Sequence, residues 1–240
     1  MLDFMKYSAI VIASMALGLS ALVSAQNALS APINDRAVVL GILAAEFSLQ
    51  NGDLATAAST YFEVAKRSQD AKVAERAVEL LMRSRRLDDA KEIAALWQEA
   101  DTSAARPHQV ALALALTSAD EARALSAVKR IAALPEATRA EAIVDAGRQL
   151  AQHRDRDFSV KLASVFTEQL PTLAEAQYAL AVASTGTSNS RLGEALIAID
   201  RALAIKPNWP QAVAAWEERL GMAEPRPEQY LSLARAQLTR

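Results

Sequence analysis

The chain has 240 residues, and its composition is typical of an all-helical protein. It contains 53 Ala but only 7 Gly, and aromatic residues make up 5%, whereas the strands of a sandwich or barrel need β-branched and aromatic side chains. The 26 basic and 28 acidic residues give a net charge of −2, which argues against a dedicated nucleic-acid binder. The absence of cysteine excludes a disulfide framework, a cysteine-ligated metal site and a cysteine nucleophile.

The N-terminal segment has the layout of a secretory signal. Residues Ser8 to Ala25 are uncharged and follow Lys6, and Val23-Ser24-Ala25 offers the small-x-small pattern that signal peptidase accepts. About 18 apolar residues are also short for a stable membrane span. The sequence therefore predicts a signal peptide at 1–25, cleaved after Ala25, and a short linker at 26–33.

The same segment leaves an alternative open, in which it stays uncleaved and anchors the protein. A second cleavage pattern, Leu29-Ser30-Ala31, fits less well because Pro32 would follow the cut. We expect an exported, periplasmic protein; the alternative is an inner-membrane anchor with the rest of the chain facing the periplasm. Contact with a membrane is expected only if the segment is not cleaved.

From Asn34 onward, apolar blocks with helical spacing alternate with short breaks that contain Pro, Gly, Asn or Asp, which are helix stop and start signals. The pattern predicts twelve helices in six pairs. Their expected ranges are 34–50, 53–68, 71–84, 87–101, 106–117, 119–133, 136–152, 155–169, 172–184, 190–205, 208–221 and 226–239. The run ALALAL at 111–116 alternates only between two apolar residues, so it does not indicate a strand.

The second helix of each pair begins with a recurring pattern: an apolar residue, two mostly polar residues and an alanine. The alanines of the four copies are Ala57, Ala90, Ala122 and Ala195, and a degenerate copy lies around Phe158 and Ser159. Prolines 135, 171 and 207 close three second helices at steps of 36 residues. A period near 34 residues with two helices per unit is typical of a helical solenoid, in which alanine sits where two backbones approach closely.

These units resemble the tetratricopeptide repeat (TPR) family. The matching positions are Gly52, Leu54, Ala57 and Tyr61 in the first unit, Leu87, Ala90, Ala94 and Trp97 in the second, and Leu192, Ala195, Ile199, Ala202 and Pro207 in the fifth. The segment Tyr61 to Ala65, with Asp70 and Arg76-Ala77, is similar to exported TPR proteins of Gram-negative bacteria. The resemblance implies a right-handed α-solenoid of about six repeats over 34–240.

The sequence contains no pattern that indicates catalysis. The two histidines, His108 and His153, are 45 residues apart without a carboxylate at ligand spacing, so surface or capping roles are expected. Nucleophile elbows, phosphate-binding glycine loops, dinucleotide fingerprints and H-E-x-x-H pairs do not occur. We therefore expect no catalytic residues, no bound metal and no cofactor.

The repeat register predicts a wall formed by the first helix of each pair, which would bind a segment of another protein. The residues expected on it are Glu46, Lys72, Glu75, Glu79, Arg83, Glu141, Arg148, Gln177, Gln211 and Glu218. Acids outnumber bases in this set, which indicates a partner with some basic character; ordinary solvated positions are the alternative interpretation.

The expected function is a non-catalytic scaffold or adaptor of the cell envelope, with another protein as partner. One alternative is a membrane-anchored accessory subunit of a secretion or envelope-assembly complex. An enzyme with an unrecognised site is the second alternative, and the scarcity of His, Cys and Gly argues against it.

Overall fold

The computed structural model describes residues 35–184, 189–207 and 209–220. Its helices are α2 (Asp35–Gln50), α3 (Leu54–Ser68), α4 (Ala71–Arg83), α5 (Leu87–Ala100), α6 (Ala105–Thr117), α7 (Glu121–Ala132), α8 (Glu136–Gln152), α9 (Arg156–Gln169), α10 (Ala174–Ala183), α11 (Asn189–Ile205) and α12 (Pro210–Leu220). Each begins and ends within about two residues of an expected helix. The expected signal peptide, linker and helix at 226–239 lie outside the described residues.

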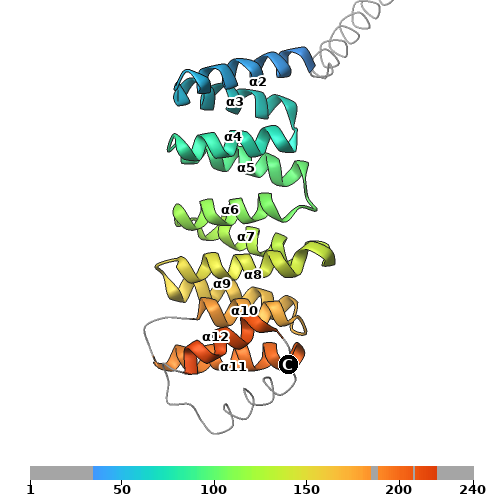
Figure 1. The fold of residues 1–240 in the computed structure, drawn as a ribbon, viewed down its shortest axis with the longest axis vertical. Coiled ribbons are helices and arrows are strands. Elements are labelled where there is room, and N and C mark those ends of the chain that lie inside the picture. The colour runs from blue at the N-terminus through green and yellow to red at the C-terminus, as the bar shows by residue number, and fades with distance from the viewer. Residues whose placement is uncertain (1–34, 185–188, 208, 221–240) are drawn as a thin grey trace, which may run out of the picture.

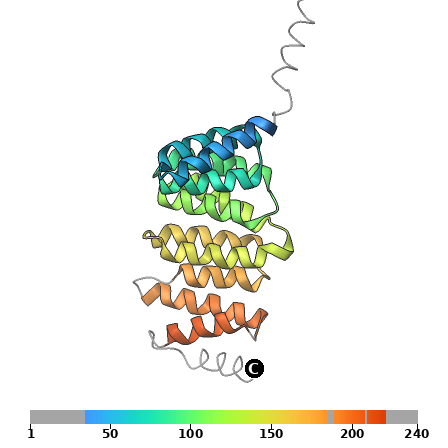
Figure 2. The same cartoon turned by 45° about the horizontal axis from the view of Figure 1, so that its top comes forward.

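The helices stack in chain order along one axis (Figures 1 and 2). Each helix packs against the next, and α8 also packs against α6 and α10. The described residues contain no strand, and the run 111–116 is part of α6. The expected all-α solenoid of helix pairs is therefore confirmed.

One small buried residue recurs at the same position in the first four pairs. The fourth residue of the second helix is Ala57 in α3, Ala90 in α5, Ala124 in α7 and Ser159 in α9. All four are fully buried, and the Ser159 hydroxyl donates to the carbonyl of Asp155 at 2.8 Å. The degenerate copy expected around Ser159 thus occupies the repeat position, with its polar atom satisfied.

The third unit corrects the expected register. Ala122 is exposed in the first turn of α7, and the buried repeat residue is Ala124. Ala119, expected to begin the helix, instead has φ 51° in the turn before it. Apolar patterning did not distinguish the two positions, because both are alanine.

The first three turns between paired helices share one hydrogen-bond pattern. In the first turn, Gly52 N–H donates to Leu49 and Asp53 N–H to Ser48; Arg85–Arg86 and Ala119–Asp120 repeat the same two bonds. This is the Schellman motif, which requires a left-handed residue. Gly52 adopts φ 79° without a steric penalty, whereas Arg85 and Ala119 adopt φ 59° and 51° as residues with a Cβ.

Aspartates define several helix starts. Asp53, Asp70, Asp120 and Asp155 each accept a hydrogen bond from a backbone N–H in the first turn of the following helix. Such a cap is worth about 0.5–2 kcal/mol. The helix boundaries could be predicted because these residues are also the breaks in the apolar pattern.

The core is divided between α5 and α6. One cluster of buried side chains lies mainly in α2–α5, another in α6–α10 and a third mainly in α10–α12. The backbones of α8 and α10 are in close contact, since a Cβ on Gly147 would lie 2.8 Å from the Cα of Ala179. The first helices α4 and α6 make no such approach, which leaves room between them for a pocket.

No helix within the described ranges is long and apolar enough to cross a membrane.

We predict that Ala124→Leu destabilises the fold by about 1–3 kcal/mol, because the added side chain overpacks the contact between paired helices. Ala122→Leu, two residues earlier on the exposed side, is the matched control and should change stability by less than about 0.5 kcal/mol. Urea unfolding of both variants measures the difference. Equal midpoints would contradict the register described above.

Candidate binding pocket on the first-helix wall

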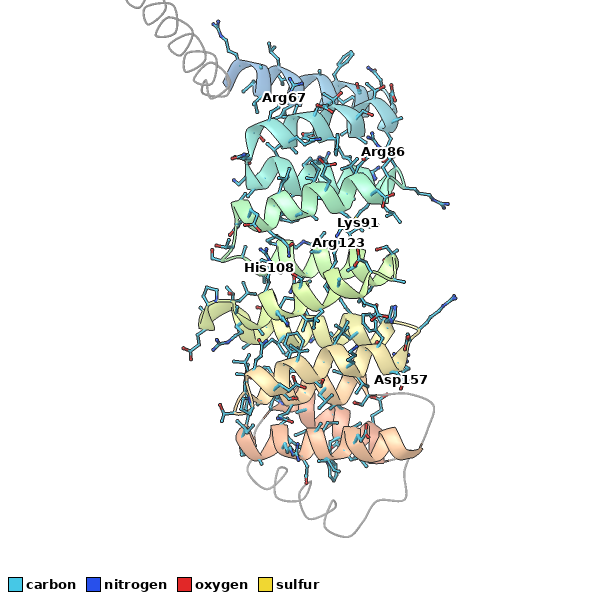
Figure 3. All side chains as sticks on the ribbon, turned by 180° about the vertical axis from the view of Figure 1, so that it is seen from behind. Arg67, Arg86, Lys91, His108, Arg123 and Asp157 are labelled. Carbon is cyan, nitrogen blue, oxygen red and sulfur yellow. The ribbon has the colours of Figure 1, made fainter. Side chains whose placement is uncertain are left out.

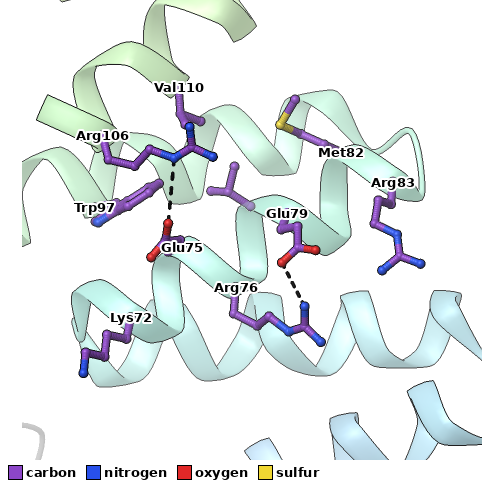
Figure 4. Close-up of a pocket in the computed structure, with 10 residues that line it drawn as sticks. Lys72, Glu75, Arg76, Glu79, Met82, Arg83, Trp97, Arg106 and Val110 are labelled. Atoms are coloured by element: carbon purple, nitrogen blue, oxygen red, sulfur yellow. Dashed lines mark hydrogen bonds and ion pairs between the residues drawn. The ribbon is translucent and has the colours of Figure 1, made fainter. Parts of the chain in front are cut away.

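The first-helix wall, formed by α2, α4, α6, α8, α10 and α12, contains a pocket of about 490 Å³ between α4 and α6 (Figure 4). Its lining residues are Lys72, Glu75, Arg76, Val78, Glu79, Met82, Arg83, Trp97, Arg106 and Val110. The volume is within the range of about 300–1,000 Å³ that small ligand sites occupy, so the pocket can accept one or two side chains of a partner.

The interior of the pocket is apolar. Trp97 of α5 and Val78 of α4 are 4% and 2% exposed, and Val110 of α6 is partly buried beside them. Met82 is 42% exposed, and its flexible thioether can adapt to different apolar contacts. A bulky apolar side chain entering here would therefore lose contact with water on most of its surface.

Charged side chains surround this interior. Four are basic (Lys72, Arg76, Arg83, Arg106) and two are acidic (Glu75, Glu79), so the rim has a formal charge of +2. Arg106 Nε lies 3.8 Å from a Glu75 carboxylate oxygen, and an Arg76 guanidinium nitrogen lies 2.8 Å from Glu79 (Figure 4).

Lys72 and Arg83, at positions 11 residues apart on α4, make no ion pair with any described residue. Both are exposed. They are therefore the two rim cations whose charge remains available to a ligand.

A hydrogen-bonded group from three helices holds Arg76 in place. Glu46 of α2 accepts from the Tyr61 hydroxyl at 2.7 Å and from Arg76 Nε at 3.2 Å. Burial and the bond to Glu46 raise the pKa of Tyr61 to about 12, while the bonds from Tyr61 and Arg76 lower the pKa of Glu46. Glu46 is thus an anion that orients Arg76 toward the pocket.

Polar links connect successive first helices. Glu46 bonds Arg76 between α2 and α4, Glu75 pairs with Arg106 between α4 and α6, and Gln109 Nε2 donates to Asp145 at 3.3 Å between α6 and α8. Exposed ion pairs contribute only about 0–1 kcal/mol each. Their main effect is to fix the orientation of the side chains along the wall.

The structure brings five of the ten predicted wall residues together. Lys72, Glu75, Glu79 and Arg83 line the pocket, and Glu46 adjoins it through Arg76. The remaining residues lie farther along the stack: Glu141 and Arg148 are exposed on α8, and Gln211 and Glu218 are exposed on α12. Arg148 pairs with Asp145 at 2.8 Å.

Gln177 does not lie on the surface of the wall. It is 5% exposed within α10, and its Nε2 donates to the carbonyl of Pro171 at 3.4 Å. The short helix α10 is buried on nearly every side, so even its polar residues are covered. Sequence reasoning treated α10 as an amphipathic helix with one solvated face.

Sequence reasoning also missed pocket residues on α5 and α6. The turn residues Arg85 and Ala119 give a repeat step of 34. By this step Arg106 is the equivalent of Lys72, and Val110 is the equivalent of Arg76. The expected repeat from Ala90 to Ala122 is a step of 32, which concealed this relation. The expected excess of acids is reversed at the pocket, where cations predominate.

A second pocket of about 210 Å³ opens between α5, α6 and α7. Lys91, Arg123 and Arg130 line it, and each is already paired with an aspartate or glutamate. The pocket between α4 and α6 is larger and has uncommitted cations, so it is the better binding site.

His108 corrects a further expectation, since it is buried rather than at the surface. The residue lies at the junction of α5 and α6 (Figure 3) and is 2% exposed. Nε2 donates to the carbonyl of Thr102 (3.3 Å), so in the neutral ring Nδ1 accepts from the Gln98 amide (3.0 Å). Burial lowers the pKa of His108.

Groups of His, Asp or Glu that could hold a metal ion are absent from the part of the chain that the structure describes.

We predict that His108 makes the fold less stable in mild acid. Because its pKa is lowered on folding, the unfolded chain takes up the proton first, and stability is lost as pH falls below the unfolded value of about 6.5. His108→Gln should reduce the slope of unfolding free energy against pH between pH 7 and 5, by up to about 1.4 kcal/mol per pH unit. His153→Gln, at a partly exposed site, is the control; an unchanged slope in His108→Gln would contradict the assignment.

No protein-family model matches the chain, and no curated protein matches it significantly in sequence. Among solved structures, it is similar to MamA, with 17% identity over 80% of this chain and 98% of MamA, at a TM-score of 0.45. A TPR protein from Parabacteroides merdae is 12% identical over 85% of this chain and 87% of its own, at 0.43. YrrB, described as a TPR protein with an unusual peptide-binding site, is 21% identical over 77% and 94%, at 0.41. The helix pairs of this chain themselves define its fold as a solenoid of stacked helix pairs.

Proposed function

We propose that the protein is a non-catalytic scaffold of the cell envelope that binds a segment of another protein in the pocket between α4 and α6. The observation that carries this proposal is the combination of an apolar interior with a rim of charge +2 on an exposed helix wall. Stacked helix pairs commonly present such extended binding surfaces.

The chemistry of the pocket selects an acidic segment with a bulky apolar side chain. The apolar side chain would contact Trp97 and Val78, and carboxylates on either side of it would reach Lys72 and Arg83. Arg83 can bind a carboxylate with two parallel hydrogen bonds, whereas Lys72 acts as a point charge. The paired residues Glu75–Arg106 and Arg76–Glu79 would fix the edges of the site.

The periplasmic location is part of the proposal and is supported by the sequence from Lys6 to Ala25. Mass spectrometry of the native protein tests it. A mature N-terminus at Gln26 is expected, because the small-x-small pattern ends at Ala25. An intact N-terminus in the membrane fraction would favour the anchored accessory subunit instead.

The binding proposal predicts a charge preference that a pair of peptides can measure. A labelled Glu-Glu-Phe-Glu-Glu peptide should bind the mature protein more tightly than Lys-Lys-Phe-Lys-Lys, and added salt should reduce the difference. Fluorescence anisotropy measures both affinities. The double variant Lys72→Glu/Arg83→Glu should weaken binding of the acidic peptide about tenfold.

The matched control is Arg148→Glu, an exposed cation on α8 of the same wall. It should leave the affinity for the acidic peptide within about twofold of the original. Equal affinity for the two peptides, or equal losses in the α4 and α8 variants, would refute binding at the α4–α6 pocket.

A further inference from the structure

The outer face of α2 exposes large apolar side chains. Val39, Leu40, Leu43 and Phe47 are 52%, 66%, 60% and 65% exposed, and only three other large hydrophobic residues in the described ranges are comparably open. We call these four residues the α2 patch. α2 is the end helix of the described stack (Figure 1), and terminal helices of solenoids normally have a polar outer face.

The next repeat shows what such a face is shaped to receive. The turn residues Gly52 and Arg85 are 33 positions apart, so Leu40 corresponds to Val73 of α4 and Phe47 to Leu80. Val73 and Leu80 are 8% and 0% exposed. α4 has α3 packed before it, and α2 has no described helix in that place. Leu40 and Phe47 therefore occupy helix-packing positions without a described helix, whereas Val39 and Leu43 correspond to the pocket residues Lys72 and Arg76.

We propose that a second copy of this chain covers the α2 patch by antiparallel pairing of the two α2 helices about a two-fold axis at Leu43. Val39 and Phe47 each lie four residues, about one turn, from Leu43. The axis therefore places Val39 of one copy opposite Phe47 of the other. An isologous contact needs a self-complementary face of this kind.

Charge favours a second copy as the occupant. The α2 patch contains no charged residue, and the pairing would place Arg36 opposite Gln50 rather than opposite another cation. Glu46, the acid nearest the α2 patch, is turned toward Tyr61 and Arg76. Because the α2 patch carries no charge, it has no electrostatic preference for a different protein. Two copies of the patch can pair without charge repulsion.

The size of the α2 patch determines the strength of the pairing. Even an aromatic side chain buries only about 150–250 Å², so four side chains fall short of the roughly 800 Å² per partner of a standard interface. We therefore expect a weak dimer that forms with rising concentration. The α4–α6 pocket does not include the α2 patch, so either proposal can fail without the other.

Sedimentation velocity of the mature protein over a range of micromolar concentrations tests the pairing. The average mass should rise toward that of a dimer, and Phe47→Glu should raise the dissociation constant at least tenfold. Ile197→Glu, at a site on α11 that is 53% exposed, is the matched control and should leave it unchanged. Circular dichroism verifies that both variants are folded.

The natural absence of cysteine allows a second measurement. Leu43→Cys places one thiol beside the proposed axis and should give a disulfide-linked dimer on mild oxidation, whereas Ile197→Cys should remain largely monomeric. A protein that stays monomeric at every concentration, or that dimerises equally with Phe47→Glu, overturns the proposal. Binding of the patch to lipid vesicles by a strictly monomeric protein would also overturn it.

Discussion

The stack depends on one repeated contact, made by a fully buried small residue at the fourth position of the second helix in the first four pairs. Ala57, Ala90, Ala124 and Ser159 occupy this position in consecutive pairs and are fully buried. The steps between them are 33, 34 and 35 residues, so the connections vary in length while the contact does not. Because the contact fixes how each pair packs, equivalent residues of successive first helices line one wall, and binding groups on different helices can act together.

The pocket on the wall lies where two successive first helices pack less closely. Gly147 against Ala179 lets α8 and α10 approach closely. Between α4 and α6, longer side chains bridge the space, as in the 3.8 Å pair of Glu75 and Arg106. The connection of residues 101–104 separates the two helix pairs at this point, and buried His108 binds the carbonyl of Thr102 within it. The pocket is thus a consequence of how two parts of the core are joined.

The helices could be predicted from sequence because each break combines an apolar gap with a capping or turn residue such as Asp53 or Asp120. The register of the third repeat could not, because Ala122 and Ala124 are chemically identical and only the left-handed turn at Ala119 separates them. That error hid Arg106 and Val110. Burial of Gln177 depends on contacts of α10 with three neighbouring helices, and the space around Trp97 depends on the separation of α4 and α6. Neither is encoded in local periodicity.

Both proposed surfaces arise where the regular stacking is incomplete. At the α2 patch no described helix packs before α2, and large apolar side chains are exposed. Between α4 and α6 the neighbour is present but not in close contact, so charged side chains close the space above the apolar floor. Since stability in a solenoid is nearly a sum of nearest-neighbour terms, such local gaps can persist without weakening distant pairs. Pairing through α2 would then join two pockets in one assembly, and a partner with two acidic segments would bind it more tightly than one pocket allows.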